Sequence, residues 1–223
     1  MDTKLLKQKI LDLAIRGKLV PQDLNDEPAS VLLEKIKKEK QELIKQGKIK
    51  KYKNESTIFV GDDKLHYEKF ADGTIKNIEE EIPFEIPETW CWCRIGYISE
   101  INLGFTHTPK YTKQGIPFIS VKDISNGRLD FSNCKYISQE EYETAAYGSK
   151  PIKGDILFGR VGTLGKPQIV DVDFKFCIFV SLGFIRIFNF PLYNKYILYW
   201  IDSSLFVNQI ARYVKGTAQI NLN

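Results

Sequence analysis

Histidine and cysteine are scarce in this 223-residue chain, which holds two histidines and four cysteines. The cysteines are Cys91, Cys93, Cys134 and Cys177. One short and two long gaps between them match no zinc-binding template, and His66 and His107 do not complete one. We therefore expect four reduced thiols and no metal site, and a lone histidine in a polar loop does not by itself indicate catalysis.

Long hydrophobic runs are also missing. The longest apolar stretch, residues 174–190, is interrupted by Lys175, Ser181, Arg186 and Asn189, so it is too polar to span a bilayer. The first residues, MDTKLLKQKI, are amphipathic and unlike a signal peptide, and no internal repeat is visible. Apolar residues nevertheless make up 43% of the chain, which is enough for a folded core.

Glycine is most concentrated in GDILFGRVGTLGKP at residues 154–167. This stretch does not match a nucleotide-binding loop. Arg160 stands where a phosphate loop needs glycine, and Pro167 stands where it needs the Ser or Thr that holds Mg²⁺. The stretch is still a turn rich in backbone N–H groups beside Arg160 and Lys166, which suits an anion such as a nucleic-acid phosphate. A plain hairpin turn, with glycines that only supply positive φ, is the alternative.

The net charge of +4 is divided unevenly. Residues 1–53 carry 14 basic and 8 acidic side chains, residues 54–100 carry 4 and 11, and residues 101–223 carry 14 and 9. Two basic regions thus flank an acidic one, which points to a polyanionic partner. For residues 1–53, a solvated helix face is the interpretation that we favour.

Residues 1–53 are predicted to form two helices. Apolar residues at 3/4 spacing from Leu6 indicate the first, which ends at Gly17, and the second begins with Pro28 at its first position and ends at Gly47. In the second, the apolar side has a gap at Lys40 that we expect a long basic stem to fill.

The rest of the chain indicates a different architecture. Residues 54–89 form a polar connector, with a hairpin predicted at Asp72-Gly73 and an extended arm after it. From residue 90, short strand-like runs precede two short helices broken at residues 202–204. We predict an α+β fold: a domain over 90–223 with a mixed or antiparallel β-sheet and short helices, preceded by a long-helix, coiled-coil-like region.

Three loops and one strand end of this domain carry donors suited to nucleic acid. Hydroxyl and cationic side chains hold phosphates, whereas amides and arginine read base edges. The candidates are Thr106, Thr108, Lys110, Ser120, Lys122, Arg160, Thr163, Lys166, Lys215, Thr217, Gln219 and Asn221. An ordinary polar surface is the alternative for each loop.

Catalysis finds less support. Asp155, Asp173 and Lys175 form a permissive nuclease-like trace that could bind Mg²⁺. No Ser/His/Asp arrangement with a recognisable elbow and no methyl-donor site is visible.

The order of these motifs resembles the specificity subunit of type I restriction–modification enzymes. LLKQKILDLAIRGKLVPQDLNDEPASVLLEKIKKEKQELIKQGKIKK resembles its helical region, and PFEIPETWCWCRIGYI resembles the entry to a target recognition domain. NLGFTHTPKY with GIPFISVKDIS, KPIKGDILFGRVGTLGK and KGTAQINLN resemble three further motifs of that domain in the family's order. The resemblance covers nearly the whole chain.

The resemblance implies a non-catalytic, DNA-reading subunit in the cytoplasm of a prokaryote. The helices 1–53 would act as spacer and docking region, 54–89 as connector and arm, and 90–223 as a target recognition domain for one half of a bipartite site. A modification subunit would supply DNA methylation, and through it a restriction subunit would join. S-adenosylmethionine, ATP and Mg²⁺ would belong to those partners, and this chain would need no cofactor.

The chain departs from the family in having one recognition domain and one helical region, where a full subunit has two of each. We therefore expect a half-subunit or a truncated product, and hypothesise a homodimer through the N-terminal helices that reads a symmetric split site. A docking protein that no longer reads DNA is the first alternative, and the Mg²⁺-dependent nuclease is the second.

Overall fold

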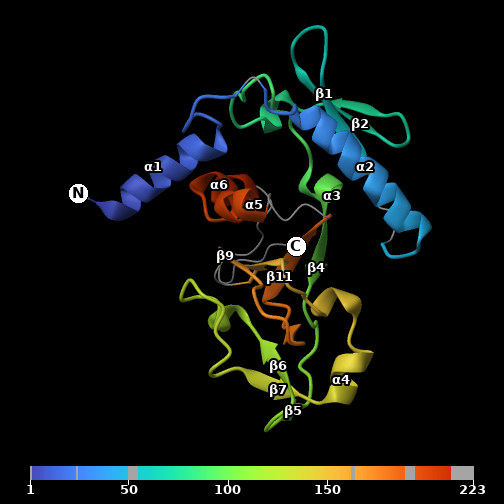
Figure 1. The fold of residues 1–223 in the computed structure, drawn as a ribbon, viewed down its shortest axis with the longest axis vertical. Helices are drawn as coiled ribbons and strands as arrows, with labels where there is room; N and C mark the ends of the chain where they lie inside the picture. Colours follow the sequence, from blue (N-terminus) through green and yellow to red (C-terminus); the bar gives the residue numbers. More distant parts are fainter. Residues whose placement is uncertain (1, 24, 50–54, 162–163, 189–193, 212–223) are drawn as a thin grey trace. The chain divides into compact units, whose positions relative to one another are not determined.

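The computed structural model describes residues 2–23, 25–49, 55–161, 164–188 and 194–211. Its contacts divide the chain into two compact units. Unit 1 comprises Met1–Asp12 and Ile101–Asn223, and unit 2 comprises Leu13–Glu100. Helix α1 (Thr3–Ile15) and strand β4 (Ser99–Leu103) each run across a boundary between the units along the sequence (Figure 1).

Helices α1 and α2 (Ala29–Lys45) both end at a glycine in the left-handed conformation, as predicted. Gly17 has φ +67° and Gly47 has φ +68°. In each case the glycine N–H and the next N–H bond back to carbonyls of the last turn, which is the Schellman arrangement. Pro28 is the N-cap of α2, with ψ 141°, so the first helical residue is Ala29, one position later than predicted.

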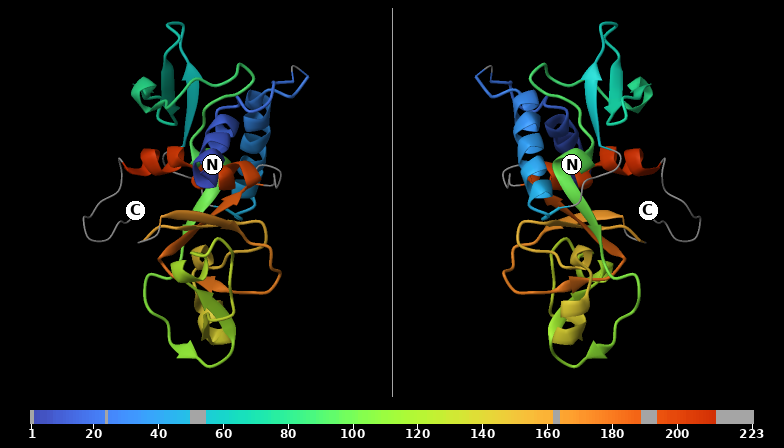
Figure 2. Two further views of the ribbon diagram at one scale, coloured as in Figure 1. Left: turned by 90° about the vertical axis from the view of Figure 1, so that its left-hand side faces the viewer. Right: turned by 90° about the vertical axis from the view of Figure 1, so that its right-hand side faces the viewer.

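Unit 2 also contains a three-stranded antiparallel sheet of β1 (Ser56–Val60), β2 (His66–Phe70) and β3 (Ile75–Asn77), in that order. The predicted hairpin at Asp72-Gly73 is confirmed, since β2 and β3 pair on either side of that turn. Strand β1, which was not expected, extends the hairpin by pairing Ile58 with Glu68. The strands can be followed in Figure 2. The 3-10 turn η1 (Glu79–Glu81) and the short helix α3 (Ile95–Ile98) complete the unit.

Charged side chains are built into the interior of unit 2. Lys40 of α2 is 4% exposed, and its Nζ lies 3.0 Å from Glu55 Oε1 and 3.2 Å from the Gly96 carbonyl oxygen. The expectation that a long basic stem fills this position of α2 is confirmed. Glu68 is 5% exposed and accepts hydrogen bonds from Ser56 and from two nitrogens of Arg94.

Unit 1 is built on two four-stranded sheets, which confirms the predicted α+β fold with a mixed sheet. The first has the order β10-β6-β7-β5, in which β10 and β6 are parallel and the other pairs antiparallel. The second has the order β4-β11-β8-β9. The strands are β5 (Tyr111–Thr112), β6 (Ile116–Ile119), β7 (Lys135–Ile137), β8 (Ile156–Gly159), β9 (Gly165–Ile169), β10 (Cys177–Ile178) and β11 (Leu182–Ile187).

Short helices lie between strands β6 and β8 of unit 1 and after its last strand. They are η2 (Val121–Asp123), α4 (Gln139–Thr144), η3 (Tyr147–Ser149), α5 (Asn194–Ile201) and α6 (Ser204–Ala211). The break between α5 and α6 falls at the predicted position. Lys7 Nζ of α1 lies 2.8 Å from Asp202 Oδ2, and Gln8 Oε1 accepts from the Ser204 N–H at 3.3 Å, so the start of α1 is bound to this helix pair.

The core of unit 1 joins the two sheets. Ile119 and Ile178 from the first sheet pack with Leu157, Leu182 and Phe184 from the second, all fully buried. A separate cluster of Phe105, Phe118, Ile137 and Cys177 lies against α4. Among the described helices, none combines the length and the apolar character that a membrane crossing requires.

Candidate nucleic-acid interface

The loop between β4 and β5 carries three of the predicted residues in exposed positions. Its base is fixed, because the Phe105 N–H donates to the Ile178 carbonyl at 2.9 Å and the Val180 N–H donates to the Phe105 carbonyl at 2.9 Å. At Gly104 a Cβ atom would lie 2.4 Å from the Ile178 carbonyl oxygen, so only glycine allows this approach. From this base the chain presents Thr106, Thr108 and Lys110 to solvent.

The two predicted residues at the end of strand β6, Ser120 and Lys122, have different roles. Ser120 and Asp123 form a capping box, in which the Ser120 N–H donates to Asp123 Oδ2 at 2.7 Å and the Ser120 hydroxyl lies 3.1 Å from the same oxygen. Ser120 therefore starts the η2 turn. Lys122, inside that turn, is exposed and directs its charge to solvent.

The two cations of the glycine-rich stretch also differ, because Arg160 is buried and Lys166 is exposed. Arg160 is 7% exposed, and its Nη1 donates to the Val180 carbonyl at 3.1 Å, while burial lowers its pKa. A contact between Arg160 and a ligand would require its side chain to leave this position. Lys166 is exposed, at an unusual φ of +50° for a residue that is not glycine. Thr163 lies outside the described residues, as do Lys215, Thr217, Gln219 and Asn221.

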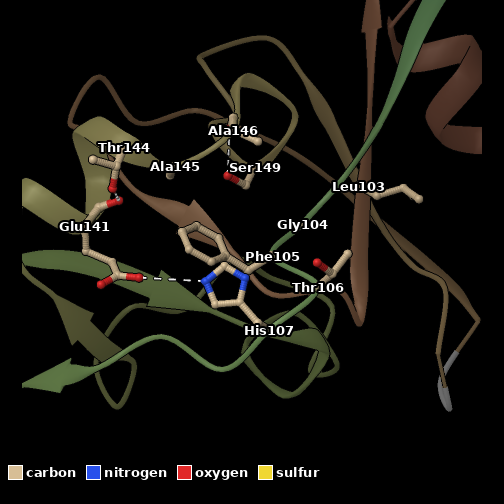
Figure 3. Close-up of a pocket in the computed structure, with 10 residues that line it drawn as sticks. All are labelled: Leu103, Gly104, Phe105, Thr106, His107, Glu141, Thr144, Ala145, Ala146 and Ser149. Atoms are coloured by element: carbon tan, nitrogen blue, oxygen red, sulfur yellow. Dashed lines mark hydrogen bonds and ion pairs between the residues drawn. The ribbon is translucent and has the colours of Figure 1, made fainter.

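A hollow of about 430 Å³ opens beside the β4–β5 loop (Figure 3). Thr106, His107 and Phe105 line one side of it, and α4 with the following turn lines the other. His107 Nε2 lies 3.9 Å from Glu141 Oε1, and the side chain of His107 is 70% exposed. The Ser149 hydroxyl donates to the Ala146 carbonyl at 2.7 Å instead of facing the imidazole. The lining is therefore mostly apolar, with a few polar groups, and presents no nucleophile activated by a base.

The residues of the nuclease-like trace are each bound to a different partner. Asp155, 2% exposed, forms a two-point ion pair with Arg186, with Nε to Oδ1 at 2.9 Å and Nη2 to Oδ2 at 2.6 Å. Asp173 pairs with Lys153 at 2.8 Å, and Lys175 Nζ lies 5.6 Å from the ring centre of Tyr142. No group of His, Cys, Asp and Glu within the described ranges could hold a metal ion. The Asp155 carboxylate is thus engaged with Arg186 inside the domain.

Sequence reasoning missed two arrangements of charge in this domain. One is the Asp155–Arg186 pair, for which a single arginine in the apolar run FIRIF was the available signal. The other is Lys135 of β7, whose Nζ lies 3.9 Å from the ring centre of Tyr111. Nothing in the sequence around Lys135 indicates this contact, because the two residues meet only through strand pairing.

Comparison with known proteins gives the sequence resemblance independent support. No protein-family model matches the chain. It is 32% identical over 214 residues to the specificity subunit of the type I restriction enzyme EcoAI of Escherichia coli, across 92% of this chain and 32% of that protein. It is 43% identical over 122 residues to the EcoEI specificity subunit of the same species, across 55% of this chain and 17% of that protein.

The predicted resemblance to type I specificity subunits is therefore confirmed, and the chain spans about a third or less of the length of these curated relatives. Among solved structures, an HsdS subunit from Thermoanaerobacter tengcongensis overlaps 53% of this chain and 28% of its own, with a TM-score of 0.41 and 21% identity. A structure of a type I R-M system overlaps 89% of this chain and 39% of its own, with a TM-score of 0.42 and 16% identity.

Proposed function

We propose that the chain binds double-stranded DNA and reads one half of a bipartite site, as a non-catalytic specificity component of a type I restriction–modification system. The observation that carries this proposal is the 32% identity to a type I specificity subunit, which extends over 92% of this chain. The basic balance of residues 101–223 and the exposed donors of the β4–β5 loop support it.

The proposed DNA contacts follow the exposure of the candidate residues. Lys110, Lys122 and Lys166 are exposed cations for phosphates, and Thr106 and Thr108 are exposed hydroxyls near bases. Ser120 shapes the backbone beside Lys122, and Arg160 would join only after rearrangement. Thr163, Lys215, Thr217, Gln219 and Asn221 complete the proposed set from outside the described residues.

The proposed partners follow from the same relatives. The helices of residues 1–53 would dock a modification subunit and through it a restriction subunit, which would supply methyl transfer, translocation and cleavage with S-adenosylmethionine, ATP and Mg²⁺. Such a system works on DNA in the prokaryotic cytoplasm, which is the location we propose. We further propose that two copies can associate through the N-terminal helices.

Selection of bound duplexes from a random pool tests the proposed function. Purified full-length chain is incubated with the pool, with and without the modification subunit, and bound DNA is sequenced. A recurrent half-site of fixed sequence is expected. Failure to enrich any sequence in both arms would contradict DNA reading.

A docking protein without DNA reading is the second candidate. The observation that favours it is the exposure of apolar side chains on α1, where Leu5 is 72%, Leu6 40% and Ile10 43% exposed. Capture of the modification subunit by this chain, together with no shift of any duplex, would favour docking over reading.

A further inference from the structure

Strand β5 forms the outer edge of a sheet and carries an aromatic ring beneath a cation. In the order β10-β6-β7-β5 (Figure 1), its one neighbour among the described strands is β7, with Tyr111 opposite Ile137 and Thr112 opposite Tyr136. Lys135, two residues before Ile137, lies on the same face as Tyr111. Its Nζ is 3.9 Å from the centre of the Tyr111 ring, within the range of a cation–π contact.

The Tyr111 ring is itself held by the core. Its centre lies 5.9 Å from that of Phe118, which is 3% exposed and belongs to the buried cluster beneath the sheet. Tyr111 as a whole remains 37% exposed. A lysine that rests on a ring fixed in this way loses less conformational freedom when it binds an anion, because part of its side-chain entropy has already been lost.

The cations around Tyr111 have no acidic partner within the described part of the chain. Lys110 and Lys113 flank Tyr111 along the sequence, and both are exposed, as is Lys135. By contrast, Lys153 elsewhere on the same unit pairs with Asp173 at 2.8 Å. Three uncompensated ammonium groups, two beside strand β5 and one on the neighbouring strand β7, attract an extended polyanion.

From these contacts we propose that Lys135, held over Tyr111, contacts a phosphate of the DNA backbone, and that Lys110 and Lys113 extend this contact along the β5 edge. This inference rests on the proposed DNA binding. A phosphate contact fixes the position of the duplex and carries no sequence information, so in this role Lys135 positions the duplex and does not select its sequence. The edge adjoins the β4–β5 loop, whose Thr106 and Thr108 would then be placed against bases.

The test is fluorescence anisotropy of the full-length chain with a labelled duplex from the selection and with an unrelated duplex, over a series of salt concentrations. Lys135→Met should weaken both duplexes by a similar factor, about fivefold at 0.15 M salt, the factor expected for one lost counterion release. The slope of log K against log salt should fall by about one. Lys153→Met is the matched control, since that lysine is exposed but already paired with Asp173.

Variants of Tyr111 test the positioning. Tyr111→Phe keeps the ring and should bind like the wild type, whereas Tyr111→Leu should lose part of the affinity. The double variant Tyr111→Leu/Lys135→Met should bind DNA as weakly as Lys135→Met alone, because the ring acts only through the lysine. Circular dichroism melts of each variant show whether the core around Phe118 is retained. If Tyr111→Leu unfolds, Lys135→Met, which leaves the ring in place, still tests the phosphate contact.

The outcomes separate the two proposals. If the wild-type chain binds neither duplex, the proposed function and this inference both fail. If the wild type binds while Lys135→Met behaves like Lys153→Met, the inference fails and DNA binding stands. A loss confined to the selected duplex would also overturn the phosphate role, because a backbone contact is shared by all sequences.

Discussion

At the scale of single residues, Arg186 and Asp155 form a buried ion pair in unit 1, with side chains 15% and 2% exposed. Arg186 also donates to the Tyr147 hydroxyl and, at 3.3 Å, to the Lys150 carbonyl. Asp155 accepts the Ile152 N–H at 2.8 Å. One pair thus joins strand β11 to the turn before β8 and to η3.

Removing one member of this pair leaves a buried charge without compensation. We expect Arg186→Met to lower the free energy of unfolding by about 3–5 kcal/mol. Urea denaturation measures the change, and Lys153→Met, which breaks an exposed pair, should cost at most about 1 kcal/mol. Equal losses in the two variants would show that burial of the Arg186 pair is not the cause.

Acidification should weaken unit 2 through Glu68. The hydrogen bonds from Arg94 hold the pKa of Glu68 below its ordinary value of 4.5. Because the folded pKa is the lower one, this contribution is complete above pH 4.5 and is lost as the pH falls through the folded value.

Glu68→Gln removes the pH-dependent contribution of this carboxylate. The unfolding free energy of the variant should therefore decline less steeply than that of the wild type below pH 4.5. Urea denaturation at a series of acidic pH values measures the two slopes. Glu85→Gln, which changes an exposed carboxyl of the same unit, serves as control. Identical slopes in all three proteins would refute the assignment.

At the scale of elements, the two glycines that end α1 and α2 differ only in their surroundings. A Cβ on Gly17 would lie 2.8 Å from Pro87 Cγ, whereas a Cβ on Gly47 would meet nothing within 4 Å. Both have the same left-handed backbone, so their substitution separates conformational cost from steric cost.

Gly47→Ala should destabilise by about 1–2 kcal/mol, the cost of a left-handed alanine. Gly17→Ala should cost more than that, because Pro87 must also move. Thermal unfolding of both variants measures the difference. A Gly47→Ala loss as large as that of Gly17→Ala would argue against the close packing of Pro87.

Helix ends were predictable from sequence because glycine and proline act locally. Gly17, Gly47 and the break before Ser204 lie where the pattern placed them, while Pro28 lies one position outside its helix. Strand β1 was missed because its pairing with β2 is decided by contacts that no local pattern records, such as the hydrogen bond between Ser56 and Glu68.

The candidate site was predictable only in part for a related reason. Composition identified which residue types could bind DNA, but burial decided which of them face solvent. Arg160 and Lys166 belong to the same motif, yet the chain reversal between β8 and β9 buries the first and exposes the second. The Lys135–Tyr111 contact depends on strand register, which the sequence does not specify at this edge.

At the scale of the whole molecule, self-association through the N-terminal helices is testable by sizing chromatography with light scattering. We expect the mass to rise toward that of a dimer with concentration, and Ile10→Glu to abolish the rise by placing a charge among Leu5 and Leu6. Ile75→Glu, at a 54% exposed position of β3, should not change it. A monomer at high concentration would contradict the homodimer.

The packing of the first residues of α1 in unit 1 matters for any attempt to produce that unit as a fragment. A fragment cut before residue 101 would lose the first twelve residues, which belong to the same compact unit and supply the partners of Asp202 and Ser204. Unit 1 is therefore assembled from two separate stretches of chain. A synthetic peptide of residues 1–12 added in trans should raise the melting temperature of the 101–223 fragment.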